Sequence, residues 1–296
     1  MSSEKRQLID ADVINRLVQY PLTTNLPMIG TVTGLHKSPH KGSSVEFAEY
    51  RKYAPGDDIR RLDWRVYART DRFYVKEFEA DTNLRCYLAV DCSGSMGFGS
   101  DGNMSKLDYA CKLAATLAYI AVQQGDAVGV QCMGNNLDIP PRRNPTHLRV
   151  VFDALEKAKS TGGTNLIQLL HELAEKIRQR AFVIVFSDFF CELSELMGCF
   201  QHLRFQKHDL AVFHLIDPIE LEFPFEHPTR FLDMEEPMSL LTEPNIIKQQ
   251  YLSNLEEFLN TLSSGCRQFN VDYRRVITNE DYEKVLANFL SERNKK

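Results

Sequence analysis

The sequence predicts an α/β fold with a doubly wound, mostly parallel sheet. Three observations lead to this prediction. From residue 84 onward, short apolar segments alternate with longer segments in which apolar residues recur at helical spacing. The apolar segments include strongly β-branched and aromatic runs such as 182–186, which indicate strands buried on both faces. The helical segments are long enough to form right-handed crossovers between parallel strands.

The elements follow in order along the chain. We expect a helix near 10–19 and a β-like, glycine-punctuated region up to residue 82. Beyond it we expect strands at 84–90, 127–133, 182–186, 210–216 and 271–277, and helices at 106–124, 147–158, 165–180, 192–205, 245–264 and 280–292. A turn at Asn135 and Asn136 leads into a short edge strand that Pro140 and Pro141 are expected to end.

These elements suggest a division of the chain into three parts. Residues 1–82 are expected to form a β-rich, charge-dense segment, and residues 83–217 the α/β core. Residues 218–296 are expected to complete the domain with a connector and a helix-strand-helix. The connector contains five prolines between 218 and 245, and we predict that it is not helical.

Composition indicates the class of protein. With 296 residues and 43% hydrophobic content, the chain can bury a sizeable core. Its net charge of -5 lacks the basic excess that non-specific nucleic-acid binding requires, so we expect no nucleic-acid partner. The seven cysteines form no C-x-x-C pair, and we see neither a signal peptide nor a run of ~18 apolar residues. We expect a cytoplasmic protein without a membrane span.

Polar loops at strand ends predict a metal site. Asp91, Ser93 and Ser95 follow the first predicted strand of the core at spacings i, i+2 and i+4, Thr164 precedes a helix, and Asp188 follows the strand 182–186. In an open parallel sheet these loops converge at one edge, where ligands bind. The set contains oxygen donors only, which suits Mg²⁺ or Mn²⁺ rather than zinc. Taken singly, Thr164 and Asp188 are also ordinary helix caps.

The same residues carry a resemblance. The pattern Asp91-x-Ser93-x-Ser95, with Gly163-Thr164 and Ser187-Asp188, resembles the metal-ion-dependent adhesion site of von Willebrand factor A domains. The resemblance implies that the three hydroxyls contact the cation and that Asp91 and Asp188 reach it directly or through water. It also implies that an acidic residue of a partner protein completes the coordination shell.

A narrower resemblance covers most of the chain. The runs EFAEYRKYAPGDDIRRLDW at 46–64 and ARTDRFYVKEFE at 68–79, with YLSNLEE at 251–257 and GCRQFNVDY at 265–273, resemble domain-of-unknown-function family fifty-eight. Its members are bacterial von Willebrand A-like proteins, often encoded beside MoxR-type AAA+ ATPases. The resemblance implies a MoxR-type ATPase as partner, with this chain as an adaptor in remodelling or maturing a client complex.

The arginine-rich part of the first run has two interpretations. Its arginines alternate with carboxylates, and the near balance of charge favours a salt-bridged seam within the protein. The alternative is a docking surface for acidic residues or phosphate, which bidentate arginine suits. The candidates for this surface are Arg51, Arg60, Arg61, Arg65 and Arg69. We expect Trp64, the only tryptophan, to be a packing anchor.

Enzymatic activity is the rival interpretation. A Mg²⁺-dependent phosphoester hydrolase could use the same strand-end residues, but it needs a positioned base or nucleophile beside the metal. Only Asp91 and Asp188 are available for that role without emptying the metal site. No P-loop is present, and Gly97–Gly102 matches G-x-G-x-x-G too far from the preceding strand for a dinucleotide site. We therefore expect a non-catalytic interaction module, with a purely structural scaffold as a third possibility.

Overall fold

The computed structural model describes residues 8–25, 46–54, 62–79, 84–100, 102–235 and 238–295. The chain divides into two compact units, which we describe separately. The larger unit contains the residues up to Asn25 and those from Arg85 onward, and the smaller unit contains Leu26–Leu84. The N-terminal helix therefore groups with the sheet, not with the β-rich segment that follows it.

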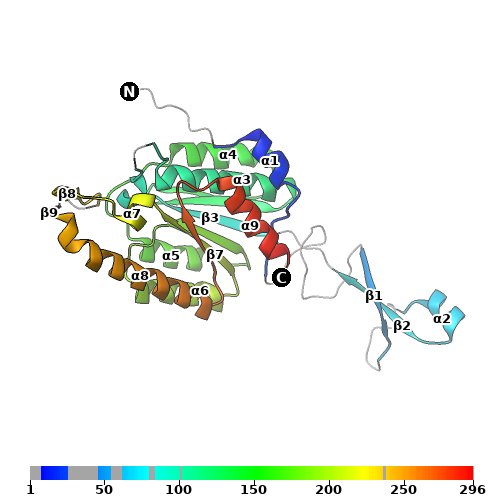
Figure 1. Cartoon of the computed structure of the whole chain (residues 1–296). Helices are drawn as coiled ribbons and strands as arrows, with labels where there is room; N and C mark the ends of the chain where they lie inside the picture. Colours follow the sequence, from blue (N-terminus) through cyan, green and yellow to red (C-terminus); the bar gives the residue numbers. More distant parts are fainter. Residues whose placement is uncertain are drawn as a thin grey trace. The chain divides into compact units, whose positions relative to one another are not determined.

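A six-stranded sheet forms the centre of the larger unit (Figure 1). Its order is β10-β7-β6-β3-β4-β5, and all neighbouring strands are parallel except β5, which is antiparallel to β4. The bounds are β3 Arg85–Asp91, β4 Ala127–Met133, β5 Leu137–Arg142, β6 Phe182–Ser187, β7 Asp209–Ile216 and β10 Asp272–Ile277. The chain winds outward from β3 in both directions, so the winding reverses between β3 and β6. The predicted fold class is confirmed.

Helices cover both faces of this sheet (Figure 1). One layer contains α1 Ala11–Leu17, α3 Lys106–Gln123, α4 Pro145–Lys157 and α9 Tyr282–Asn294, and the other contains α5 Leu166–Lys176, α6 Leu193–Phe205 and α8 Pro244–Gln268. Helix α3 is buried along most of its length because it packs on the sheet and on its helical neighbours. Its alanines let these neighbours approach closely. Strands β6 and β7 are buried at every position, as central strands between two helical layers should be.

The edge strand β5 corrects one expectation. We expected Pro140 and Pro141 to end it, yet the strand continues through both to Arg142. Strand β5 is an edge strand that pairs only with β4. Its other side faces no strand, so a proline there removes no hydrogen bond of the sheet. The pairing register also shifts opposite the prolines, at Gly129, where a Cβ atom would lie 2.6 Å from the nitrogen of Pro141. Glycine and a β-bulge together accommodate the prolines.

The proline-rich connector corrects a second expectation, because it begins with a short helix. Helix α7 spans Pro218–Glu222 and is followed by a hairpin of β8 Thr229–Leu232 and β9 Ser239–Thr242. Pro218 occupies the start of the helix, where a missing N–H has no cost. Asp217 accepts a hydrogen bond from the N–H of Ile219, and Glu220 accepts one from the N–H of Asp217, which makes a capping box.

The smaller unit contains the antiparallel strands β1 Glu46–Lys52 and β2 Tyr74–Glu79, with helix α2 Trp64–Thr70 between them. Asp63 caps α2 by accepting from the N–H groups of Arg65 and Val66. Trp64 is 60% exposed, so the expectation that it is a packing anchor is wrong. It is the first residue of a helix with no buried positions, and its ring meets that of Tyr67 edge-on, with the centroids 6.2 Å apart.

Two further features concern the whole described structure. In the part of the chain that the structure describes, none of the helices is both long and apolar enough to cross a lipid bilayer. All seven cysteines lie in described segments, and none forms a disulfide.

Candidate functional site

The candidate site lies where the winding of the sheet reverses. Asp91 is the last residue of β3, and Asp188 directly follows β6, the parallel neighbour of β3. After Asp91 the chain turns into a short 3-10 helix, η2 Gly94–Gly97, which carries Ser95. The loop before α5 brings Thr164 to the same place. All five residues predicted to bind metal line one cavity of about 250 Å³, which we call the polar cavity.

Asp91 is buried and held at both oxygens. Its side chain is 2% exposed. Oδ1 accepts a hydrogen bond from the N–H of Ser93 at 2.9 Å, and Oδ2 accepts one from the hydroxyl of Ser187 at 2.6 Å. Burial raises the pKa of Asp91 to about 6; the negative charge of Asp188 adds to this, and the hydrogen bonds from Ser187 and Ser93 oppose it. The Asp91 carboxylate is thus held in position by two hydrogen bonds, but its negative charge is disfavoured by burial and by Asp188.

The hydroxyl groups of the site lie close together. The Oγ atoms of Ser93 and Ser95 are 3.1 Å apart. Thr164 approaches from the opposite loop, near Gly134, which follows β4 with a φ of +95°. A Cβ atom on Gly134 would lie 2.7 Å from the hydroxyl of Thr164. Glycine at position 134 therefore permits both the backbone conformation and the approach of this threonine.

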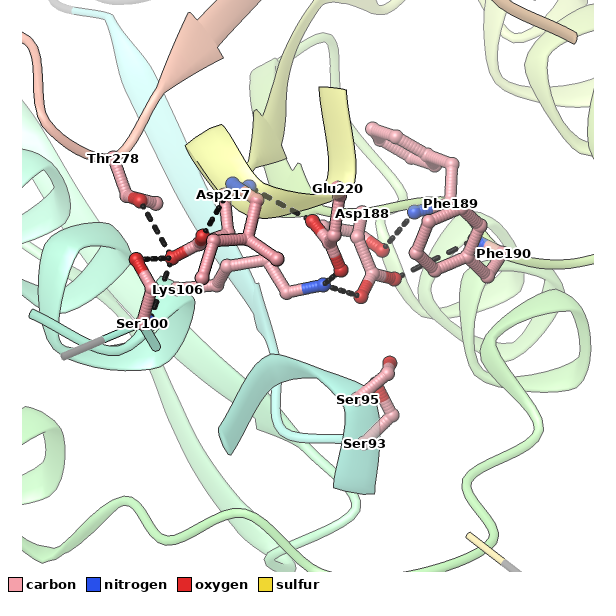
Figure 2. Close-up of polar contacts among 12 residues, drawn as sticks. Ser93, Ser95, Ser100, Lys106, Asp188, Phe189, Phe190, Asp217, Glu220 and Thr278 are labelled. Carbon is pink, nitrogen blue, oxygen red and sulfur yellow. Dashed lines mark hydrogen bonds and ion pairs between the residues drawn. The ribbon is translucent and has the colours of Figure 1, made fainter. Parts of the chain in front are cut away.

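Lys106 is a residue of the site that the sequence did not predict. It is fully buried, and its Nζ lies 2.7 Å from Oδ2 of Asp188 and 2.7 Å from Oε1 of Glu220 (Figure 2). Burial lowers the pKa of Lys106, but the charges and hydrogen bonds of Asp188 and Glu220 outweigh it, and the pKa stays above its ordinary value. A protein cation therefore already compensates one carboxylate of the candidate metal set.

A signal for Lys106 was present in the sequence. The residue stands in the first turn of α3, where the helix dipole disfavours a positive charge. It also shares a helical face with Ala110 and Ala114, four and eight residues later, which belong to the apolar stripe. A lysine at the start of a buried stripe indicates a buried carboxylate partner, because an unpaired buried charge is very costly.

Asp217 organises the neighbouring loops and was also not predicted. It is buried at the end of β7 and accepts hydrogen bonds from the N–H and the hydroxyl of Ser100, at 2.9 and 3.0 Å (Figure 2). The hydroxyl of Thr278, which follows β10, donates to the same oxygen at 3.4 Å. Asp217 thus ties the loop after η2 to α7 and to the end of β10.

The arginine candidates belong to the smaller unit. Arg65 and Arg69 lie on α2 with exposed side chains. Arg51 lies in β1, and its side chain is not described. Arg60 and Arg61 lie outside the described residues.

The donor set of the polar cavity suits a hard divalent cation. The five predicted residues offer two carboxylates and three hydroxyls, from Asp91, Asp188, Ser93, Ser95 and Thr164, all of them oxygen ligands. The carboxylates of Glu192, Glu195 and Glu235 line the same cavity. Among the described residues, no group of three or more His, Cys, Asp or Glu side chains is arranged to hold a metal ion. A divalent cation in the polar cavity would offset the burial of Asp91 and its repulsion by Asp188, so the residues present fit Mg²⁺ or Mn²⁺.

Several known proteins are similar to this chain. The uncharacterized protein Rv1480 of Mycobacterium tuberculosis is 28% identical over 211 residues, which are 69% of this chain and 65% of that protein. The chain thus matches just under two thirds of that relative's length. The uncharacterized protein YeaD of Bacillus subtilis is 28% identical over 102 residues, which are 34% of this chain and 23% of that protein.

A solved structure and a family model complete the comparison. The conserved hypothetical protein BatB from Bacteroides thetaiotaomicron has a TM-score of 0.48 and 15% identity, covering 72% of this chain and 100% of BatB. The model of the family described as "Protein of unknown function DUF58" matches residues 49–255, well over half of the chain. The chain therefore belongs to the DUF58 family.

Proposed function

We propose that this protein is a non-catalytic, divalent-metal-dependent protein-interaction module. The observation that carries the proposal is the convergence of five oxygen-bearing side chains on one cavity at the point where the winding of the sheet reverses. This is where open α/β sheets bind their ligands. Asp91 is buried there, and the nearby charge of Asp188 adds to the cost of burying it, which a bound cation would offset.

The cation in this proposal is Mg²⁺ or Mn²⁺. The hydroxyls of Ser93, Ser95 and Thr164 would hold it, with Asp91 and Asp188 bound directly or through water. When bound, the cation supplies a coordination position that a carboxylate of a partner protein can take. The contacts of Asp91 with Ser187 and with the N–H of Ser93 fix one ligand, and the ion pair with Lys106 fixes Asp188.

The partner in this proposal is a MoxR-type AAA+ ATPase. Membership of the DUF58 family and the resemblance of the sequence to von Willebrand A-like proteins support an adaptor that presents a client through an acidic residue. The exposed arginines of α2, Arg65 and Arg69, together with Arg51, Arg60 and Arg61, are candidates for docking the ATPase. We propose that the complex acts in the cytoplasm.

The proposal assigns no reaction to the polar cavity. A hydrolase needs a base or nucleophile free to act beside the metal, whereas both oxygens of Asp91 accept hydrogen bonds and an oxygen of Asp188 is paired with Lys106. Hydrolysis of p-nitrophenyl phosphate with Mg²⁺ checks this point. Turnover that disappears in Asp91→Ala would favour the hydrolase.

The test of the proposed function is complex formation in solution. The purified chain and a MoxR-type ATPase from the same organism are mixed, and sedimentation velocity is measured with Mg²⁺ and with EDTA. We expect a complex in Mg²⁺ that dissociates in EDTA and in Ser93→Ala/Ser95→Ala, while Ser194→Ala, an exposed serine at the start of α6, leaves it intact. A complex that persists in EDTA would contradict metal dependence and favour the scaffold.

A further inference from the structure

A second cavity adjoins the polar cavity. Its volume is about 530 Å³, and it lies between η2, α7 and the β8–β9 hairpin. The two cavities share Ser95, Phe190 and Glu235 as lining residues. A ligand bound in one therefore lies beside the other.

Aromatic rings form the walls of this second cavity, which we call the aromatic cavity. Its rings are those of Phe98, Phe190, Phe223, Phe225, Phe231 and Tyr251. Four of them pack against one another: the centroid of Phe223 lies 4.7 Å from that of Tyr251 and 5.1 Å from that of Phe225, which in turn lies 5.1 Å from that of Phe231. Mutual packing of this kind holds the walls in place before any ligand arrives.

The aromatic cavity opens onto apolar side chains. Leu232 is 66% exposed, and Met234 and Phe190 are also exposed. All three line the cavity. Large apolar side chains that gather around a concave opening mark a binding site, since single exposed apolar residues occur on any surface but a contiguous group beside a cavity is rare.

Charge decides what this cavity accepts. Lys106 lies over the rings of Phe98 and Phe190, with its ammonium 5.9 and 5.1 Å from their centroids. The same ammonium is paired with Glu220, another lining residue. The faces of these two rings and this carboxylate thus already interact with a cation, and Lys106 would repel a second one. Asp233 and Glu235 line the cavity from its exposed side, whereas the aromatic walls favour a large apolar side chain.

From this arrangement we propose that the ligand is a peptide segment that combines a carboxylate with a large apolar or aromatic side chain close by in sequence. The carboxylate enters the polar cavity and the apolar side chain enters the aromatic cavity. The first half of this statement rests on the proposed function. The apolar side chain is inferred from the aromatic cavity alone, and it defines the class of peptide that the protein would select.

The backbone at Met234 fixes the two cavities relative to each other. A Cβ atom on Gly94, within the Asp91–Ser95 loop, would overlap the carbonyl oxygen of Met234 and lie 2.9 Å from its carbonyl carbon. Glu235 follows directly, and its N–H donates to Asp233 at 2.7 Å. The segment after β8 thus packs against the candidate metal loop. This contact fixes the position of the aromatic cavity relative to the polar cavity.

Four short peptides test the proposal as a double-mutant cycle. Each is a fluorescein-labelled peptide with Asp or Asn at one position and Phe or Ala at a second. The set of four is made at spacings of one to four residues, and an Asp/Arg peptide is added at each spacing. Anisotropy is measured with the full chain in Mg²⁺. We expect the Asp/Phe peptide to bind roughly tenfold or more tightly than Asp/Ala at one spacing, as burial of a phenyl ring implies.

Two matched variants locate the apolar contact. Leu232 and Leu241 are both exposed leucines of the β8–β9 hairpin, but only Leu232 lines the aromatic cavity. Leu232→Ser should reduce the preference for Phe over Ala several-fold, and Leu241→Ser should leave it unchanged. Equal loss in both variants would contradict the assignment.

The outcomes separate this inference from the proposed function. Equal binding of Asp/Phe and Asp/Ala at every spacing overturns the aromatic subsite and leaves carboxylate recognition standing. Equal binding of Asp/Phe and Asn/Phe overturns carboxylate recognition and leaves the apolar subsite. Tighter binding when Arg replaces Phe overturns the preference for a neutral side chain, and no binding by any peptide overturns the two-part ligand as a whole.

Discussion

The ammonium group of Lys106 lies 2.7 Å from a carboxylate oxygen of Asp188, and both side chains are buried, at 0% and 2% exposed. This ion pair places a protein cation at the edge of the candidate metal site. Oδ2 of Asp188 is thereby engaged, whereas Oδ1 accepts a long hydrogen bond from the N–H of Phe190, at 3.4 Å, and is the oxygen more open to a metal or a water. Glu220, at 2.7 Å from the same ammonium, extends the pairing to helix α7.

Removing this cation should destabilise the fold. Lys106→Met leaves the buried Asp188 and the partly buried Glu220 without their partner, and breaking a buried pair in this way costs about 3–5 kcal/mol. The control is Lys112→Met on the same helix, whose ammonium lies 5.6 Å from the ring centroid of Tyr282; its loss should cost at most ~1 kcal/mol. Urea denaturation measures both, and similar values for the two variants would refute the importance of the pair.

The same variant should respond more strongly to metal. In Lys106→Met, Oδ2 of Asp188 loses its partner, while Oδ1 keeps the hydrogen bond from the N–H of Phe190 at 3.4 Å. Saturating Mg²⁺ should therefore raise the melting temperature more in this variant than in the wild type. Differential scanning fluorimetry with and without Mg²⁺ gives the comparison. An equal response would mean that Lys106 does not compete for Asp188.

Gly94 and Gly198 should respond in opposite directions to the same substitution. Gly94→Ala forces the new methyl group against the carbonyl of Met234, and such overpacking costs about 1–3 kcal/mol. Gly198 lies in α6 with open space around its Cα, so Gly198→Ala should stabilise the protein by about 0.5–1 kcal/mol. Thermal unfolding of both variants checks the pair. A tolerated alanine at position 94 would show that the segment after β8 does not pack there.

His208 should make stability depend on pH. Its Nδ1 accepts a hydrogen bond from the N–H of Ala181 at 3.2 Å, which requires a neutral ring. Burial lowers the pKa of His208 to about 4, and the nearby His202 contributes in the same direction. Because the unfolded chain keeps the ordinary value of 6.5, it binds more protons between pH 6.5 and 4, and stability is lost as the pH falls through this window.

The variant His208→Asn isolates this contribution. The stability of the wild type should fall more steeply than that of the variant between pH 6.5 and 4, with a difference in slope of at most about 1.4 kcal/mol per pH unit. Urea denaturation at several pH values provides the slopes. Parallel slopes would mean that His208 titrates normally in the folded protein.

Arg293 should anchor the opposite end of the sheet. Its guanidinium pairs with Asp209 and Asp272, donates to the carbonyl of Thr23 at 2.8 Å and stacks over the ring of Phe182. Arg293→Met leaves two carboxylates without this partner and should cost about 3–5 kcal/mol. Arg16→Met is the control, because it breaks a solvent-exposed pair with Glu283 and should change stability little. Equal effects in urea denaturation would contradict this ranking.

Much of the candidate site follows from the sequence because parallel topology is predictable. Asp91 and Asp188 follow apolar strands, and neighbouring parallel strands end at the same edge of the sheet. Helical crossovers between successive strands require that parallel topology. The five oxygen donors consequently line one cavity, as the spacing of the motifs suggested.

Long-range pairings explain what the sequence did not reveal. Lys106 meets Asp188 and Glu220 across 82 and 114 residues, and no local pattern encodes which carboxylates it joins. The five prolines of the connector argue against a helix, yet α7, which carries Glu220, begins with Pro218, because the first position of a helix favours proline. The aromatic cavity depends on this helix and on the β8–β9 hairpin, so it could not be predicted either.

Isothermal titration of Mg²⁺ and Mn²⁺ into the EDTA-treated protein tests the central claim most directly. The wild type should bind one ion per chain, and Ser93→Ala/Ser95→Ala should bind none while unfolding at a temperature close to that of the wild type. The absence of binding to the wild type, both alone and with a saturating Asp/Phe peptide, would contradict a metal site in the polar cavity.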